Sequence, residues 1–173
     1  MKRGNKKAQS IMGLPFSMIF SVILIVFFII AAIIAIKLFW NPTGCGFSDN
    51  SQEALFKKDL QTTIEDAWIS DRSESGFKIN LPGKITQVCF FNTESPARGD
   101  YADISEELDR FSSSGVNNVY LYPVRSACED FRGWEVQHIN ITEITKQDNP
   151  YCVDAKKNLT IEKGFYDYLV KIR

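Results

Sequence analysis

Histidine and closely spaced cysteines are scarce in this chain of 173 residues. His138 is the only histidine, and the four cysteines lie 44, 39 and 24 residues apart, without a C-x-x-C pair. A structural zinc site usually contains such a pair, and a thioredoxin-like redox site requires one. The sequence therefore predicts no metal site, no redox motif of that kind and no cofactor.

The signature motifs of several common enzyme classes are also missing. The chain contains no G-x-x-x-x-G-K-[ST], H-E-x-x-H, G-x-S-x-G or G-x-G-x-x-G string. Glu106 and Asp109 could supply the paired carboxylates of a glycosidase, but a solvated helix face is the simpler explanation for them. His138 lies in a strand-like run without a catalytic partner nearby in sequence. We therefore expect a non-enzymatic protein, with an extracytoplasmic enzyme as the minority alternative.

Charge is absent from a long N-terminal stretch. No charged residue occurs between Ala8 and Ile36, and 18 of the 19 residues from Met18 to Ile36 are apolar. A membrane-crossing helix needs about 20 such residues for about 30 Å of hydrocarbon. The stretch therefore predicts a permanent transmembrane helix over 11–40. A cleaved signal peptide is the alternative, although no small-x-small site follows the apolar run.

The distribution of charge predicts an orientation. Lys2, Arg3, Lys6 and Lys7 precede the apolar run without an acidic residue, whereas residues 41–173 contain 15 basic and 21 acidic residues. Basic residues near a span tend to stay in the cytoplasm. We expect a cytoplasmic segment over 1–10, a linker over 41–50 and an extracytoplasmic domain over 51–173. This makes a single-pass protein of the cell membrane, and the acidic outer domain argues against binding to nucleic acid.

All four cysteines, Cys45, Cys89, Cys128 and Cys152, fall in the part of the chain placed outside the membrane. An even number of cysteines in such a domain favours two disulfide bonds. Three pairings are open. The strand-like surroundings of Cys89 and Cys128 favour pairing these two, which leaves Cys45 with Cys152.

Two triplets match the acceptor pattern for N-glycosylation. They are Asn140-Ile141-Thr142 and Asn158-Leu159-Thr160. We expect Asn158 to be the better acceptor because it lies in a predicted turn.

Apolar periodicity predicts an α+β domain with an antiparallel sheet and two helices behind the transmembrane helix. Leu55, Phe56, Leu60, Ile64, Ala67 and Trp68 recur at helical spacing, which predicts an amphipathic helix over 51–69. The second helix is expected at 101–111. The expected strands are 77–81 and 85–91 around Pro82-Gly83-Lys84, 119–122, 134–141, a hairpin of 151–153 with 159–162, and 169–172.

Aromatic residues are plentiful in the outer domain, and most should fill its core. Two strings offer an alternative, an exposed recognition patch. They are Tyr120-Leu121-Tyr122-Pro123 and Phe165-Tyr166-Asp167-Tyr168.

The N-terminus resembles a known class of signal sequence. Lys6-Lys7-Ala8-Gln9-Ser10, followed by a long apolar run, is similar to the class III signal sequences of archaeal type IV pilin-like proteins. The resemblance implies cleavage by a membrane peptidase between Ala8 and Gln9. The acidic residue that pilin-like helices carry soon after that position has no counterpart before Asp49.

The whole chain is similar to a family of single-span membrane proteins from small-genome archaea. The similarity rests on the single apolar span, the MGLPFSMIF start and the cysteine-containing strings VCF, ACE and PYC. It implies location and topology. We therefore expect a membrane-anchored extracytoplasmic protein that serves cell-surface assembly or contact. The most specific version of this hypothesis is a pilin-like subunit. The expected partners are the lipid bilayer and other surface proteins or copies of the chain itself. The alternative is an accessory subunit of a membrane transport or secretion complex.

Overall fold

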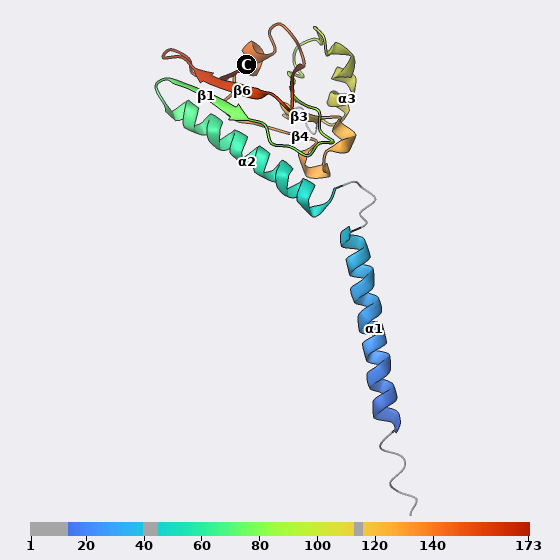
Figure 1. Ribbon diagram of the computed structural model, residues 1–173. Coiled ribbons are helices and arrows are strands. Elements are labelled where there is room, and N and C mark those ends of the chain that lie inside the picture. Colours follow the sequence, from blue (N-terminus) through green and yellow to red (C-terminus); the bar gives the residue numbers. More distant parts are fainter. Residues whose placement is uncertain (1–13, 40–44, 113–115) are drawn as a thin grey trace, which may run out of the picture. The chain divides into compact units, whose positions relative to one another are not determined.

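The computed structural model describes residues 14–39, 45–112 and 116–173, and within the first of these ranges it describes the side chains of residues 19–34 and 36 (Figure 1). The chain divides into two compact units, Met1–Pro42 and Thr43–Arg173. The proposed processing site at Ala8 and Gln9 and the predicted cytoplasmic segment lie outside the described residues.

The described part of the first unit is one helix, α1 (Leu14–Phe39). In the described part of the chain, no helix is both long enough and apolar enough to cross a membrane. The prediction of a long transmembrane helix ahead of the domain is therefore wrong for the described residues.

The second unit is an α+β domain, as predicted, but it contains two antiparallel sheets and several helices where one sheet and two helices were expected. The first sheet has the strand order β1-β6-β7, and the second has the order β4-β3-β2-β5. The strands are β1 (Ser73–Lys78), β2 (Gln87–Phe90), β3 (Val119–Tyr122), β4 (Gly133–Trp134), β5 (Tyr151–Asp154), β6 (Asn158–Lys163) and β7 (Lys171–Ile172).

Two predicted hairpins are wrong. β5 and β6 follow each other in the chain, but β5 pairs with β2 in one sheet, and β6 pairs with β1 and β7 in the other. β1 and β2 likewise belong to different sheets, although a turn separates them. In both places the turn residues mark the point where the chain passes from one sheet to the other. Turn-forming residues predict where the chain changes direction, but they do not determine which strand the following strand pairs with.

A long helix, α2 (Phe47–Ile69), packs against β1 and β6. It begins four residues earlier than predicted, after the extended Gly46. Phe56, Leu60, Ile64 and Ala67 are buried on one face of it, at spacings of three and four residues. The predicted amphipathic helix is confirmed, except that Leu55 and Trp68 are exposed.

The second sheet is buried on both faces, and alternate residues of its central strands face opposite ways. Val88 and Phe90 of β2 join the larger core cluster beneath α2. Cys89, between them, joins a smaller cluster with Leu108 and Tyr120. The smaller cluster lies under α3 (Ser105–Arg110), which is preceded by the 3-10 turn η1 (Ala102–Ile104) and is shorter than the predicted helix over 101–111.

Short turns of helix connect the remaining strands. They are η2 (Val124–Ser126), η3 (Glu129–Phe131) and α4 (Ile141–Ile144). The predicted strand over 134–141 is thus mostly loop and helix, and His138 within it has a positive φ of 66°, which a regular strand does not accommodate.

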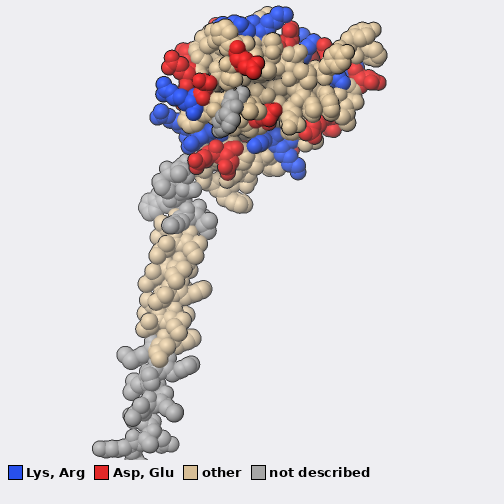
Figure 2. All heavy atoms as spheres, turned by 180° about the vertical axis from the view of Figure 1, so that it is seen from behind, with Lys and Arg blue, Asp and Glu red and all other residues tan. Residues whose placement is uncertain are grey.

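Acidic and basic side chains are interspersed over the face of the second unit shown in Figure 2. Uncharged side chains project from the same unit at its upper right in that view.

Candidate functional site

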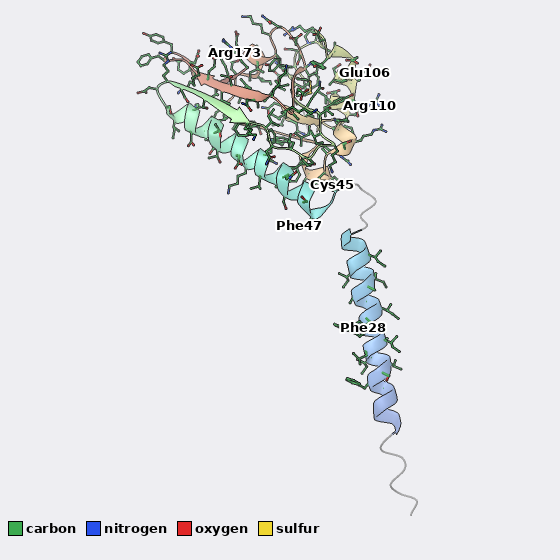
Figure 3. All side chains as sticks on the ribbon, in the orientation of Figure 1. Phe28, Cys45, Phe47, Glu106, Arg110 and Arg173 are labelled. Carbon is green, nitrogen blue, oxygen red and sulfur yellow. A yellow bond between two sulfur atoms is a disulfide. The ribbon has the colours of Figure 1, made fainter. Side chains whose placement is uncertain are left out.

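Large apolar side chains gather on the surface where α2 ends and the loop between β6 and β7 lies. We call this surface the aromatic tip, and define it as Trp68, Ile69, Phe165, Tyr166, Tyr168 and Leu169. Phe165 is 68% exposed, Tyr166 is 89% exposed and Tyr168 is 91% exposed. Side chains project into open space at this end of the unit, to the upper left in Figure 3. Exposed aromatic residues in one place are typical of a surface that contacts a partner.

The loop of the aromatic tip is held in a defined turn by Asp167. Its Oδ2 accepts a hydrogen bond from the Gly164 N–H at 2.9 Å, and its Oδ1 accepts one from Lys171 Nζ at 3.0 Å. The hydrogen bond from Lys171, together with the one from Gly164, lowers the pKa of Asp167. The turn therefore presents Phe165, Tyr166 and Tyr168 on an ordered backbone.

A lysine connects this loop to the end of α2. Lys163 Nζ donates to the carbonyl oxygen of Trp68 at 2.6 Å and to that of Ser70 at 2.7 Å. A cation at the C-terminal end of a helix also interacts favourably with the helix dipole. Lys163 thus places the aromatic loop next to Trp68 and Ile69.

His138 packs at the edge of the aromatic tip. Its ring stacks on that of Trp68 with the centroids 3.7 Å apart and the planes 8° apart. Its carbonyl oxygen accepts a hydrogen bond from the Val170 N–H at 2.9 Å. The histidine therefore stacks against a helix and pairs with the chain leading into β7.

Only one of the two aromatic strings forms an exposed patch. Tyr120 and Leu121 are fully buried, and Tyr120 belongs to the cluster beneath α3. The string Phe165-Tyr166-Asp167-Tyr168 is the exposed one. The difference arises because Tyr120 lies in a central strand of a sheet that is covered on both faces, whereas Tyr166 lies in a loop.

The four cysteines form two disulfide bonds, Cys45–Cys128 and Cys89–Cys152. Two disulfides were predicted, but the favoured pairing was wrong. Cys89 and Cys152 lie directly opposite each other on the antiparallel strands β2 and β5. Cys45, just before α2, bonds to the cysteine that precedes η3.

The surroundings of Cys89–Cys152 are apolar. Cys89 is fully buried and packs in a cluster with Phe91, Leu108 and Tyr120. Because the bond also joins neighbouring strands of a buried sheet, it acts as part of the domain core.

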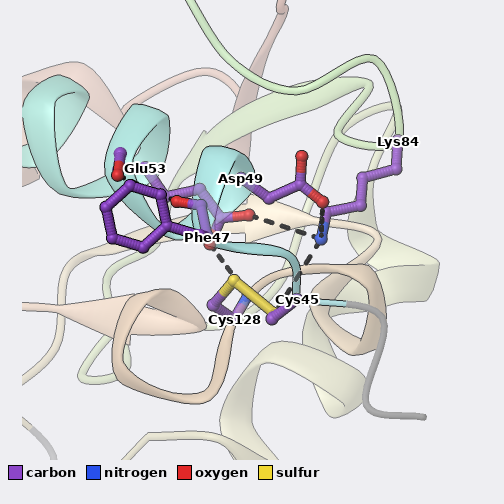
Figure 4. The surroundings of a disulfide bond; sticks show 7 residues. Cys45, Phe47, Asp49, Glu53, Lys84 and Cys128 are labelled. Carbon is purple, nitrogen blue, oxygen red and sulfur yellow. Dashed lines mark hydrogen bonds and ion pairs between the residues drawn. A yellow bond between two sulfur atoms is a disulfide. The ribbon is translucent and has the colours of Figure 1, made fainter. Parts of the chain in front are cut away.

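The surroundings of Cys45–Cys128 are charged, as Figure 4 shows. Lys84 Nζ lies 3.8 Å from Cys45 Sγ and 3.0 Å from an Asp49 carboxylate oxygen. The same ammonium lies 3.9 Å from Glu53 Oε1. Three segments meet here: the start of α2, the turn before β2 and the segment before η3.

Glu53 is the least expected member of this cluster because its side chain is fully buried. Its Oε2 accepts a hydrogen bond from the Cys128 N–H at 2.8 Å. Its Oε1 is also buried and accepts no hydrogen bond among the described residues. Burial raises the pKa of the Glu53 carboxyl, and the Cys128 hydrogen bond and Lys84 only partly oppose this.

Sequence reasoning missed Glu53 and Lys84 as neighbours of a disulfide. A signal for Glu53 was present, since it lies three residues before Phe56 and so falls on the buried stripe of α2. Lys84 gave no signal, because its predicted role in a tight turn says nothing about which segment packs against that turn.

The carboxylate pair considered for catalysis has other contacts. Glu106 forms an exposed ion pair with Arg110 at 3.7 Å, one helical turn away. Asp109 is exposed on the same short helix. Neither side chain lines the cavity beside α4.

That cavity has a volume of about 490 Å³ and lies between α4 and the strands β5 and β7. Its lining includes Lys146, Asp148, Tyr151, Lys171 and Arg173, so charges of both signs face it. Among residues 14–39, 45–112 and 116–173, no cluster of three or more His, Cys, Asp or Glu side chains is arranged to hold a metal ion.

The two glycosylation triplets differ in structure. Asn140 caps α4, and its Oδ1 accepts a hydrogen bond from the Glu143 N–H at 3.0 Å. Asn158 is exposed at the start of β6. Attachment of a glycan at Asn140 would disturb a helix cap, whereas Asn158 has no such role.

The candidate functional features are thus two regions at opposite ends of α2: the aromatic tip, and the Cys45–Cys128 disulfide with its charged neighbours. No protein-family model, no curated protein and no solved structure matches the chain.

Proposed function

We propose that this chain is a non-enzymatic extracytoplasmic protein whose disulfide-stabilised domain mediates contact or assembly at the cell surface through the aromatic tip. The observation that carries the proposal is the exposure of Phe165, Tyr166 and Tyr168 on a single ordered loop. Large aromatic side chains of this kind dominate the energy of many protein interfaces.

The two disulfides support the extracytoplasmic location. All four cysteines of the chain are paired. Structural disulfides persist in oxidising compartments and are rare in a reducing cytoplasm.

The order of the loop supports a role in contact. Asp167 and Lys163 fix its backbone by hydrogen bonds to Gly164 and to the end of α2. A loop ordered before binding loses less conformational entropy when a partner arrives. The loop therefore presents its aromatic rings at little further entropic cost.

Attachment assays on cells that express the protein test the role of the tip. The double variant Tyr166→Ser with Tyr168→Ser should lower attachment to neighbouring cells or surfaces about tenfold, because two exposed aromatic anchors are lost. The matched control replaces two exposed apolar residues outside the tip, Leu55→Ser with Val116→Ser. The control should attach like the wild type, and equal attachment by both double variants would contradict the proposal.

Protease treatment of intact cells tests the location separately. We expect an added protease to digest the domain of residues 45–173 while a cytoplasmic marker protein stays intact. Protection of the domain in intact cells, followed by digestion after lysis, would contradict the extracytoplasmic location.

A further inference from the structure

The two disulfides of this domain differ in their electrostatic surroundings. Cys45 is half-buried, and Lys84 Nζ lies 3.8 Å from its sulfur. Cys89 is fully buried among apolar and aromatic side chains. Thiol–disulfide exchange passes through negatively charged sulfur, which a nearby cation stabilises and an apolar environment disfavours.

We propose that Cys45–Cys128 is a site of thiol–disulfide exchange with an external dithiol, whereas Cys89–Cys152 is a permanent structural bond. The dithiol belongs to the chemical class of the paired thiols found in oxidoreductases or in dithiothreitol. This proposal does not depend on the function of the aromatic tip.

The exposure of the two cysteines determines which sulfur atom is attacked in the first step. Cys45 is half-buried, whereas Cys128 is only 3% exposed, so Cys45 is the residue that an external thiolate reaches first. The first thiolate of the dithiol attacks Cys45 Sγ and forms a mixed disulfide. The bond to Cys128 breaks, and the Cys128 sulfur leaves with the electron pair and takes up a proton.

Lys84 acts in both steps, because Cys45 Sγ beside it is the sulfur attacked in the first step and the leaving thiolate in the second. The second thiolate of the dithiol attacks its own partner sulfur, and Cys45 leaves as a thiolate beside the Lys84 ammonium. The dithiol ends as a cyclic disulfide. It has supplied two electrons, and the two cysteines end as thiols once Cys45 is protonated.

Neighbouring groups hold the lysine near the sulfur. Asp49 binds Lys84 Nζ at 3.0 Å, and Glu53 lies 3.9 Å from the same nitrogen. When both are ionised, these two carboxylates outnumber the single ammonium and oppose its effect. Lys84 still favours the thiolate because its nitrogen is the charged group in direct contact with Cys45 Sγ. Cys45 also comes two residues before the N-terminal end of α2, where the helix dipole favours negative charge.

Reduction of the native full-length chain tests the proposal directly. The oxidised protein is incubated with increasing ratios of reduced to oxidised dithiothreitol, alkylated, and mapped by peptide mass spectrometry. We expect Cys45 and Cys128 to be labelled at ratios that leave Cys89 and Cys152 unlabelled. Labelling of all four cysteines together, or of Cys89 and Cys152 first, would overturn the proposal without the need for any variant.

Variants then test the part played by Lys84. Lys84→Gln should slow reduction of the Cys45–Cys128 bond about tenfold, since a unit charge near 4 Å is lost from a partly exposed site. Lys84→Arg keeps the charge and should restore most of the rate. The control Lys146→Gln removes an exposed lysine with a similar ion pair, to Glu143 at 3.5 Å, and should leave the rate unchanged.

The pH dependence of alkylation distinguishes an electrostatic role from a structural one. After reduction, Cys45 in the wild type should become reactive at a lower pH than Cys45 in the Lys84→Gln variant. Identical pH profiles in the two proteins, or an unchanged rate of reduction in Lys84→Gln, would overturn the role of Lys84.

Discussion

At the scale of single residues, Glu53 shows how a charge can be placed in a domain core. The carboxylate lies on the buried stripe of α2 and reaches the Cys128 N–H and the Lys84 ammonium. These contacts offset only part of the cost of removing the charge from water, as the raised pKa of Glu53 shows.

Replacement of Glu53 tests this balance. Glu53→Gln keeps an acceptor for the Cys128 N–H and removes the charge, so the variant should have a higher free energy of unfolding than the wild type at pH 7. Because a raised pKa means that the folded state binds the proton more tightly, the wild type should gain stability as the pH falls through that pKa. The advantage of Glu53→Gln should therefore shrink on acidification, as measured by urea unfolding across pH.

Glu53→Ala is the informative control for the same site. It removes the acceptor of the Cys128 N–H and leaves a small cavity, so it should cost roughly 1–3 kcal/mol. A Glu53→Gln variant as unstable at pH 7 as Glu53→Ala would show that the charge itself stabilises the fold.

At the scale of secondary structure, the positions of the helices and strands were predicted better than the pairing of the strands. The periodicity of Phe56, Leu60 and Ile64 marks the buried face of α2, because a helix repeats its contacts every three or four residues within one segment. The partner of β6 depends on packing between segments far apart in sequence, such as Phe77 opposite Leu159. No local pattern records that choice, which is why the hairpin of 151–153 with 159–162 was wrong.

The loop between β6 and β7 gives an element-scale prediction. Asp167→Ala removes the acceptor for the Gly164 N–H and for Lys171, so amide hydrogen exchange in residues 164–169 should become faster while β6 remains protected. Hydrogen exchange followed by mass spectrometry measures both.

Acidification should have the same effect in the wild type. The lowered pKa of Asp167 means that its contribution is present above its unfolded-state pKa and is lost as the pH falls through the folded-state value. Loop exchange that does not respond to acid would contradict the role of Asp167.

At the scale of the whole molecule, composition predicted the number of disulfides but not their pairing. Four cysteines in a domain predicted to lie outside the cytoplasm indicated two bonds, and Cys45 and Cys89 gave no local sign of their partners. The cross-strand contact of Cys89 with Cys152 exists only because β5 pairs with β2. The string Phe165-Tyr166-Asp167-Tyr168 was identified from sequence as a possible exposed patch, whereas Trp68 was expected on the packing face of a helix and Leu169 in a strand.

Removal of each bond gives a prediction for the domain. The bonds join cysteines 83 and 63 residues apart. On the chain-entropy model, loops of these lengths give about 4–5 kcal/mol each. Cys45→Ala with Cys128→Ala, and Cys89→Ala with Cys152→Ala, should therefore each lower the free energy of unfolding by about that amount, as measured by urea denaturation.

The variant that lacks both bonds should be largely unfolded, because domains are typically stable by only about 5–15 kcal/mol. A loss below about 1 kcal/mol for either pair would contradict the estimate.

The placement of α2 also has a mechanical consequence. The 23 residues of this helix extend for about 34 Å, with Cys45 before one end and the aromatic tip at the other. A pulling force between the N-terminal end of the domain and a partner held at the tip would therefore act along the helix axis. Cys45–Cys128 links the end of α2 that bears the force covalently to the rest of the domain. The disulfide bond therefore carries the force, and the helix stays packed against its sheet.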